Sequence, residues 1–203
     1  MNFYDIYPQF QECKKEIEIA KDLLINCFKD EKKLLVCGNG GSSSDALHIV
    51  GELQKSFSKK RPLTENQEKL FEFSKFKDKL CNNLENGVFA LSLVSEAALN
   101  FAIANDIGAE FCFAQQVWAT GRKGDILMCL STSGNSKNVV LAAHTAKAKG
   151  MLVIGLTGNN KTSELNYISD VCINAPAMDT AHIQELHLPI YHYLCKSIEL
   201  ELF

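Results

Sequence analysis

Two pairs of side chains have the spacing to do acid–base or metal chemistry from helices. His48 and Glu52 are four residues apart and therefore project from one face of a helix. Gln184 and His192 lie two turns apart, about 12 Å along an ideal helix axis, so both can reach a group between them. Imidazole and carboxylate groups transfer protons and bind metals. Taken alone, a pair such as His48 and Glu52 is more often a surface hydrogen bond. The neighbouring loops are therefore needed to judge whether the pair belongs to a functional site.

A loop rich in glycine and serine, Cys37–Asp45 (CGNGGSSSD), follows a predicted strand and leads into the helix that carries His48. Glycine allows positive φ values and close backbone approach, and the free amides at a helix start attract anions. The dinucleotide pattern G-x-G-x-x-G fails because position 43 is serine, and a Walker loop would need Gly-Lys followed by Ser or Thr. The loop therefore suits a sugar or its phosphate.

A second polar loop, Ser131–Ser136 (STSGNS), again lies between a predicted strand and a predicted helix. It places four hydroxyl groups and a glycine at the amino end of the helix, where one serine would be enough to cap it. Neutral donors in this position suit a phosphate monoester that must bind and leave. We therefore expect a phosphate site here.

These loops are predicted at the ends of parallel strands. Short, continuously apolar runs alternate with segments of helical spacing, as in a parallel sheet covered on both faces. This order predicts an α/β fold, a doubly wound five-stranded parallel sheet flanked by helices. Ligands bind outside the carboxyl ends of the strands in such sheets. The predicted strands are 34–37, 88–94, 126–130, 151–156 and, more weakly marked, 171–175.

Two long helices are predicted near the ends of the chain, over residues 8–29 and 180–203. A sheet of five short strands cannot cover every face of two such helices. Their outer apolar faces are therefore expected to meet partner chains. The alternative is that both helices pack wholly on their own sheet.

Residues 56–87 are predicted to add an amphipathic helix between the first two strand–helix units. The segment opens with three basic residues, Lys59, Lys60 and Arg61, which we expect to form a solvated surface rather than a binding patch. Thr64 and Gln67 then have the spacing of a capping box. The apolar stripe of the predicted helix consists of Leu70, Phe71, Phe73, Phe76 and Leu80.

The composition fits one globular domain: 203 residues, 46% of them hydrophobic and 22% charged, with a formal net charge of −3. It excludes a disordered chain and argues against nucleic acid as a partner. No uncharged stretch is longer than 11 residues, and the first residues lack the pattern of a secretory signal, so we expect a cytoplasmic protein without a membrane partner. The eight cysteines include no CxxC pair and are expected to be buried, reduced thiols.

At these residues the chain resembles the phosphoheptose isomerase family, whose members have the SIS (sugar isomerase) fold. The resemblance spans most of residues 34–192 and is carried by CGNGGSSSDALHIVGEL (37–53), AIANDIG (102–108), GRKGDILMCLSTSGNS (121–136), IGLTG (154–158) and IQELH (183–187) followed by His192. It implies one SIS domain over residues 1–203 and a homotetramer with active sites between subunits. The implied reaction is aldose–ketose isomerisation of sedoheptulose 7-phosphate to D-glycero-D-manno-heptose 7-phosphate, in heptose biosynthesis.

The resemblance also implies which positions bind the metal and which contact the substrate. One Zn²⁺ ion per subunit would be held by His48, Glu52, Gln184 and His192, and Glu52 and Gln184 would also touch the substrate. For the reaction, we assign Glu52 as the general base and His192 as the partner acid or base. Further contacts with the substrate are implied for Asn39, Gly40, Gly41, Ser42, Asn105, Asp106, Ser131, Thr132, Ser133 and Ser136.

Two departures from the family pattern leave alternatives open. Position 181, often acidic in relatives, is alanine here, with Asp179 two residues earlier. The 56–87 segment lengthens the stretch between His48 and Asp106, and it could cover the site, alter the substrate or change the assembly. One rival function is a non-catalytic SIS-domain regulator of the type that binds a replication initiator. Retention of all four implied zinc ligands argues against it. The other rival is an isomerase for a different phosphosugar.

Overall fold

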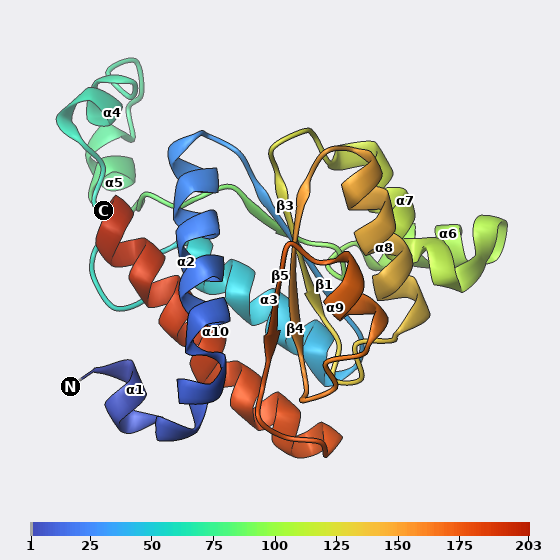
Figure 1. The fold of residues 1–203 in the computed structure, drawn as a ribbon. Helices are drawn as coiled ribbons and strands as arrows, with labels where there is room; N and C mark the ends of the chain where they lie inside the picture. Colours follow the sequence, from blue (N-terminus) through green and yellow to red (C-terminus); the bar gives the residue numbers. More distant parts are fainter. Residues whose placement is uncertain (1) are drawn as a thin grey trace.

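Five parallel strands form the centre of the fold in the computed structural model, which describes residues 2–203 (Figure 1). Their order in the sheet is β2-β1-β3-β4-β5. Four strands agree with the predicted ranges to within one residue at each end, whereas β2 is shorter than the predicted 88–94. The doubly wound α/β fold is confirmed. The bounds are β1 Leu34–Gly38, β2 Ala90–Ser92, β3 Ile126–Leu130, β4 Leu152–Thr157 and β5 Val171–Asn174.

The central strands are apolar throughout because their residues alternate between two buried layers. Leu34 and Val36 of β1 face the layer that contains α2 (Lys14–Lys29), α3 (Gly41–Gln54) and α10 (Thr180–Leu202). Leu35 and Cys37 face the opposite layer, with α7 (Cys112–Thr120), α8 (Lys137–Ala148) and α9 (Glu164–Ile168). Figure 1 shows these layers on the two sides of the sheet.

The helices from the two ends of the chain pack against each other. The predicted helix over 8–29 is a 3-10 segment, η1 (Pro8–Cys13), followed by α2, and a short α1 (Phe3–Ile6) precedes it that the sequence pattern did not indicate. The C-terminal prediction is confirmed by α10, which lies beside α2 (Figure 1). Leu188 and Leu200 on α10 are exposed. That such outer positions meet partner chains stays a prediction.

The 56–87 segment is helical but does not form the single amphipathic helix that was predicted. Two helices of five residues, α4 (Glu65–Lys69) and α5 (Lys77–Cys81), replace it, and neither buries a residue. The capping box of Thr64 and Gln67 is confirmed. Residues 63–84, which we call the projecting part, extend from the body near the end of α10 (Figure 1). The predicted apolar stripe consequently has no core to face, and Phe73 is 89% exposed.

The three basic residues at the start of this segment do not share one environment. Lys59 and Lys60 are exposed, as expected, but Arg61 is 2% exposed, so the prediction of a solvated triplet was wrong for this residue. The reason is a buried acidic partner, Glu199 on α10, whose carboxylate pairs with the Arg61 guanidinium. The partner is 138 residues away in the sequence, beyond the reach of local charge patterns.

All eight cysteines are free thiols in the described part of the chain, and five of them are buried. Burial raises the pKa of the Cys195 thiol to about 12, so this group behaves as a small apolar side chain.

Over residues 2–203, no helix combines the length and the apolar character that crossing a membrane requires.

Candidate active site

The two polar loops meet where neighbouring strands end. β1 and β3 pair in register from Leu34 opposite Ile126 to Gly38 opposite Leu130, so the loops that follow them start side by side. A reciprocal pair of amide hydrogen bonds joins the loops: Asn39 Nδ2 donates to Asn138 Oδ1 at 2.8 Å, and Asn138 Nδ2 donates to Asn39 Oδ1 at 2.9 Å. Spacing alone did not indicate this contact, because its partners lie 99 residues apart.

The glycine-rich loop has the tight geometry that its sequence suggests. Gly40 has φ +54°, in the region that side chains disfavour. Gly41 lies against Gln184 at the start of α10, where a Cβ atom would come within 2.7 Å of both amide atoms, Oε1 and Nε2. Ser42 is buried, whereas Asn39, Gly40 and Gly41 are exposed. The loop thus offers an open backbone surface with the Gln184 amide at its edge.

The second loop gathers its hydroxyls at the amino end of α8. Ser131 Oγ lies 2.9 Å from Ser136 Oγ and 3.5 Å from Ser133 Oγ, and Ser136 is the residue that precedes the helix. Gly134 turns the chain with φ +68°. Thr132 belongs to the same turn, and its carbonyl accepts a hydrogen bond from Gly158 N at 3.1 Å. The hydroxyl cluster at a helix start is the arrangement predicted for a phosphate.

Three of the four implied zinc ligands come together across α3 and α10. His48 Nε2 lies 3.2 Å from Glu52 Oε1, which confirms that the two share one helix face. His192 Nε2 lies 3.5 Å from His48 Nε2. The second oxygen of Glu52 is 3.7 Å from Lys55 Nζ. The cluster therefore holds two imidazoles and one carboxylate, with the His48 side chain 41% exposed.

Two residues that the sequence analysis missed support His48 from behind. The Tyr191 hydroxyl lies 3.2 Å from Asp45 Oδ1 and 3.0 Å from His48 Nδ1. The Tyr191 hydroxyl donates to the Asp45 carboxylate and can accept from Nδ1–H of His48, which orients the imidazole towards Glu52 and His192. Burial raises the pKa of Asp45, opposed by the hydrogen bond from Tyr191 and by the nearby His48. Tyr191 adjoins His192 in the sequence, but only the fold brings it to Asp45.

The electrostatics of His192 favour its neutral form. Burial lowers the pKa of His192, the neighbouring His48 lowers it further, and Glu52 acts in the opposite direction. The nearby His187 is distinct, because it is fully buried and its Nε2 lies 3.3 Å from the Thr157 carbonyl oxygen. Burial lowers the pKa of His187 to about 4, so this histidine is a neutral core residue at pH 7.

The donor set fits zinc in part. Among residues 2–203, no group of three or more His, Cys, Asp or Glu side chains is placed so that it could hold a metal ion. One donor separation nevertheless matches a tetrahedral ion and another is slightly shorter, since ligands about 2.0–2.2 Å from zinc lie roughly 3.3–3.6 Å apart. The separations here are 3.5 Å between the two Nε2 atoms and 3.2 Å between His48 Nε2 and Glu52 Oε1. The fourth implied ligand, Gln184, packs on Gly41.

Asn105 and Asp106 lie apart from this cluster. They fall in the π-helical η2 (Ala104–Gly108), after α6 (Ala97–Ile103), and both are exposed. Asn105 Nδ2 donates to Asp106 Oδ1 at 2.8 Å, and no hydrogen bond within residues 2–203 joins either side chain to His48, Glu52 or His192. A π-helical turn often marks a functional position and was not predicted.

Asp179 and Ala181 both lie at the start of α10. Asp179 is the residue that caps this helix, and its Oδ1 accepts a hydrogen bond from His182 N at 3.1 Å. Ala181 is exposed. The Asp179 carboxylate therefore stabilises the start of α10.

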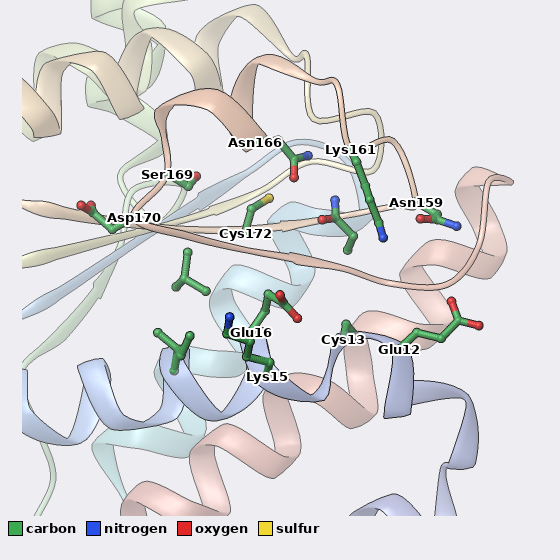
Figure 2. A pocket seen from close by; sticks show the side chains of 13 residues that line it. Glu12, Cys13, Lys15, Glu16, Asn159, Lys161, Asn166, Ser169, Asp170 and Cys172 are labelled. Atoms are coloured by element: carbon green, nitrogen blue, oxygen red, sulfur yellow. The ribbon is translucent and has the colours of Figure 1, made fainter.

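Two hollows border the fold at different places. One of about 310 Å³ lies beside the glycine-rich loop and is lined by Asn39, Gly40, Asn138 and residues of α7. The other, of about 380 Å³, lies at the opposite edge of the sheet, between the N-terminal helices and β5 (Figure 2). Figure 2 shows Lys161, Asn166 and Glu16 around it. None of the predicted site residues lines this second hollow.

The family is decided by comparison with known proteins. A family model described as the SIS domain matches residues 3–86 and 85–158. A phosphoheptose isomerase of Laribacter hongkongensis is 38% identical over 182 residues, which cover 89% of this chain and 81% of that protein. The chain belongs to the phosphoheptose isomerase family.

Solved structures agree with this membership. The phosphoheptose isomerase of Neisseria gonorrhoeae matches with a TM-score of 0.75 and 31% identity, covering 97% of this chain and 94% of that chain. The Francisella tularensis phosphoheptose isomerase matches with a TM-score of 0.76 and 28% identity, covering 96% of this chain and 90% of that chain. The SIS fold implied by the sequence motifs is thereby confirmed for this member of the phosphoheptose isomerase family.

Proposed function

We propose that this chain isomerises sedoheptulose 7-phosphate to D-glycero-D-manno-heptose 7-phosphate, as an enzyme of heptose biosynthesis in the cytoplasm. The observation that carries the proposal is the cluster of His48, Glu52 and His192 beside two loops suited to a sugar phosphate. An acid–base cluster without an anion loop would not select a phosphosugar, and an anion loop alone would bind without reacting. Membership in the phosphoheptose isomerase family supports the choice of sugar.

The loops bind and orient the substrate. Ser131, Thr132, Ser133 and Ser136 hold the phosphate at the start of α8, where helix amides and hydroxyls donate to its oxygens without a fixed counter-charge. The backbone of Asn39, Gly40 and Gly41, with Ser42 and Gln184 at its edge, lines the sugar. Two-point binding fixes the carbon that must lose a proton against Glu52.

Glu52 and His192 move the protons. A carboxylate oxygen of Glu52 takes one proton from C1 of the ketose, the C1–H electron pair forms the C1–C2 double bond, and the C2 oxygen gains a proton from His192. The C1 hydroxyl then loses its proton to His192, the C1–O double bond forms, and Glu52 returns its proton to C2. No proton is lost overall, so the reaction needs no co-substrate. Burial and the neighbouring His48 lower the pKa of His192, which makes it easier for the protonated imidazole to give its proton to the C2 oxygen.

The site would also hold one zinc ion. His48, Glu52, Gln184 and His192 would be its ligands, and the 3.5 Å separation of the two histidine Nε2 atoms suits zinc. When bound, a divalent ion supplies Lewis acidity that stabilises negative charge on the C1 and C2 oxygens. Nε2 of His192 cannot carry a proton and hold a metal at once, so its two proposed roles exclude each other at any instant.

We further propose that residues 1–203 form one SIS domain that assembles as a homotetramer with active sites between subunits. Asn105 and Asp106 support this arrangement, because they are implied substrate contacts yet are exposed and apart from the His48 cluster. Exposed apolar side chains surround them, including Phe101 at 77% and Ile107 at 55%. A second subunit that covers this surface would bring further groups to the substrate.

The direct test is a panel of ketose phosphates with five to seven carbons, incubated with the purified protein in heavy water. The proton on Glu52 can exchange with solvent before it is returned, so deuterium is expected at C2 of the aldose and, on reversal, at C1 of sedoheptulose 7-phosphate, with a strong loss in His192→Gln. Preference for a shorter sugar would make the chain a different phosphosugar isomerase. Binding of sugar phosphate without exchange would favour a non-catalytic regulator, and would contradict the proposal.

A further inference from the structure

Arg61 makes two sets of contacts that connect α3 with α10. Its Nε lies 2.8 Å from Glu199 Oε1, and the two side chains are 1% and 0% exposed, so the ion pair is fully buried. Cζ of Arg61 lies over the Phe203 ring, 4.8 Å from its centroid. Arg61 also anchors the base of the projecting part, because its carbonyl accepts a hydrogen bond from Asn86 N at 2.7 Å.

The Glu199 carboxylate is saturated with donors from one loop. It accepts from Phe57 N at 2.8 Å, Ser58 N at 2.8 Å, Ser58 Oγ at 2.5 Å and Lys59 N at 3.1 Å, besides Arg61. Burial acts to raise the pKa of Glu199, but the hydrogen bonds outweigh it and hold the pKa at about 2. The carboxylate is therefore charged at neutral pH and fixes Arg61 in one orientation.

The other side of the guanidinium meets the end of the helix that carries the proposed base. Nη1 of Arg61 donates to the Leu53 carbonyl at 2.9 Å, and Nη2 donates to the Glu52 carbonyl at 3.0 Å. α3 ends at Gln54, so these carbonyls belong to the last turn and have no partner within the helix. A planar guanidinium can bond two adjacent carbonyls and a carboxylate together, which a lysine ammonium cannot do in the same geometry.

We propose that Arg61 is a positioning residue for Glu52: it fixes the last turn of α3, and with it the Glu52 carboxylate, against the helix that carries His192. Glu199 orients Arg61 and lies two helical turns beyond His192 on α10. The same guanidinium thus sets the backbone of one proposed catalytic group relative to the helix of the other. The inference rests on the proposed isomerase function.

The rival explanation is that the ion pair merely stabilises the fold. A buried ion pair is often replaceable by uncharged residues at little cost, whereas removing one partner leaves an unpaired charge. Stability and positioning can therefore be separated. In the double variant Arg61→Met with Glu199→Gln, no charge is left unpaired and the glutamine oxygen can still accept from the amides of Ser58 and Lys59. The Glu52 carbonyl loses its donor, and the Leu53 carbonyl keeps only Val88 N, at 3.1 Å.

A second buried ion pair offers the matched control. Lys33 and Asp125 are 13% and 2% exposed, and Asp125 also accepts from backbone amides, Lys33 N at 3.1 Å and Arg122 N at 2.7 Å. This pair precedes β1 and β3, at the end of the sheet opposite the candidate site. The control variant is Lys33→Met with Asp125→Asn.

The experiment compares melting temperature, kcat and KM for sedoheptulose 7-phosphate in the wild type, Arg61→Lys, Glu199→Gln and the two double variants. Misplacement of a catalytic group by about 1 Å costs on the order of 100-fold in rate, so kcat should fall by about 10- to 100-fold in every Arg61 variant. KM should stay within about threefold, because the phosphate loop is untouched. In the control variant, the melting temperature should fall by about as much as in the double variant at Arg61 and Glu199, while kcat stays at the wild-type value.

The kcat values of the two double variants support or overturn the positioning role. Near-normal kcat in the double variant at Arg61 and Glu199 would overturn the positioning role, as would an equal loss of kcat in the control. Should a single variant fail to fold, the double variant still decides through kcat. A wild type that exchanges no proton of any ketose phosphate would instead refute the proposed isomerase, and the positioning role with it.

Discussion

The α3–α10 junction and the projecting part are close together in the chain, but different kinds of contact hold them. In the α3–α10 junction, formed by Asp45, His48, Glu52 and Arg61 with Tyr191, His192 and Glu199, polar groups are fixed by partners from another helix. In the projecting part, residues 63–84, apolar side chains are exposed and neither helix buries a residue. Polar groups such as Arg61 and Glu199 are thus buried in the junction, whereas Leu70, Phe73 and Phe76 are exposed in the projecting part. Long-range partners, not hydrophobicity, distinguish the two.

The largest effect is expected on kcat, when Glu52 of the junction and Glu65 of the projecting part are each replaced by glutamine. Glu52→Gln removes the proposed base, and the loss of a general base lowers kcat by about 10²–10⁴-fold. Glu65→Gln, in the exposed first turn of α4, should leave kcat unchanged. Steady-state rates with sedoheptulose 7-phosphate measure both. Equal activity of the two variants would remove the functional side of the comparison.

The next effect is on stability and depends on pH. The pKa of Glu199 is about 2 in the folded protein and about 4.5 in its ordinary state, so folding favours the ionised carboxylate. The stabilisation, of about 3 kcal/mol at most, is complete above pH 4.5 and is lost as pH falls towards 2. Urea unfolding of the wild type and Glu199→Gln should therefore differ at pH 7 and converge at low pH. A difference that does not depend on pH would contradict the charge assignment.

A smaller effect is expected at the phosphate loop. Ser136→Ala removes one hydroxyl from the cluster at the start of α8 and should raise KM by about tenfold, because a hydrogen bond to a charged group is worth about 1.5–3 kcal/mol. Ser74→Ala in the projecting part is the control, since its hydroxyl accepts from Phe76 N within the same turn. If KM is unchanged in Ser136→Ala, the phosphate lies elsewhere.

The smallest effect should come from removing most of the projecting part. Replacing residues 64–84 by two glycines keeps the backbone bridge between Pro62 and Glu85. Because α4 and α5 bury no residue, the free energy of unfolding should change by less than about 1 kcal/mol. A large loss of stability, or a smaller assembly by light scattering, would show that Phe73 and its apolar neighbours are covered by another subunit.

Much of this comparison could be predicted from local sequence. Continuous apolar runs located the strands because both faces of the sheet are covered, and the four-residue spacing placed His48 beside Glu52. The Thr64 capping box was also evident. Each of these features depends on residues close together in the chain, which is where patterns of spacing are informative.

What could not be predicted depends on distant partners. Arg61 follows two exposed lysines and has the same local signal, yet it is buried because Glu199 lies 138 residues away. Tyr191 and Asp45 are 146 residues apart. The single helix expected in the 56–87 segment was wrong for a related reason, since an apolar stripe stabilises a helix through a surface to pack on, and here that surface is missing from the described chain, residues 2–203.

Loss of the C1 proton signal of sedoheptulose 7-phosphate in heavy water, followed by proton NMR, tests whether the α3–α10 junction places Glu52 to remove a proton from carbon. The wild type should exchange one C1 proton and form the aldose, while Glu52→Gln, with its fold intact by circular dichroism, should bind the sugar phosphate and exchange almost none. Exchange at the wild-type rate in Glu52→Gln would contradict the account.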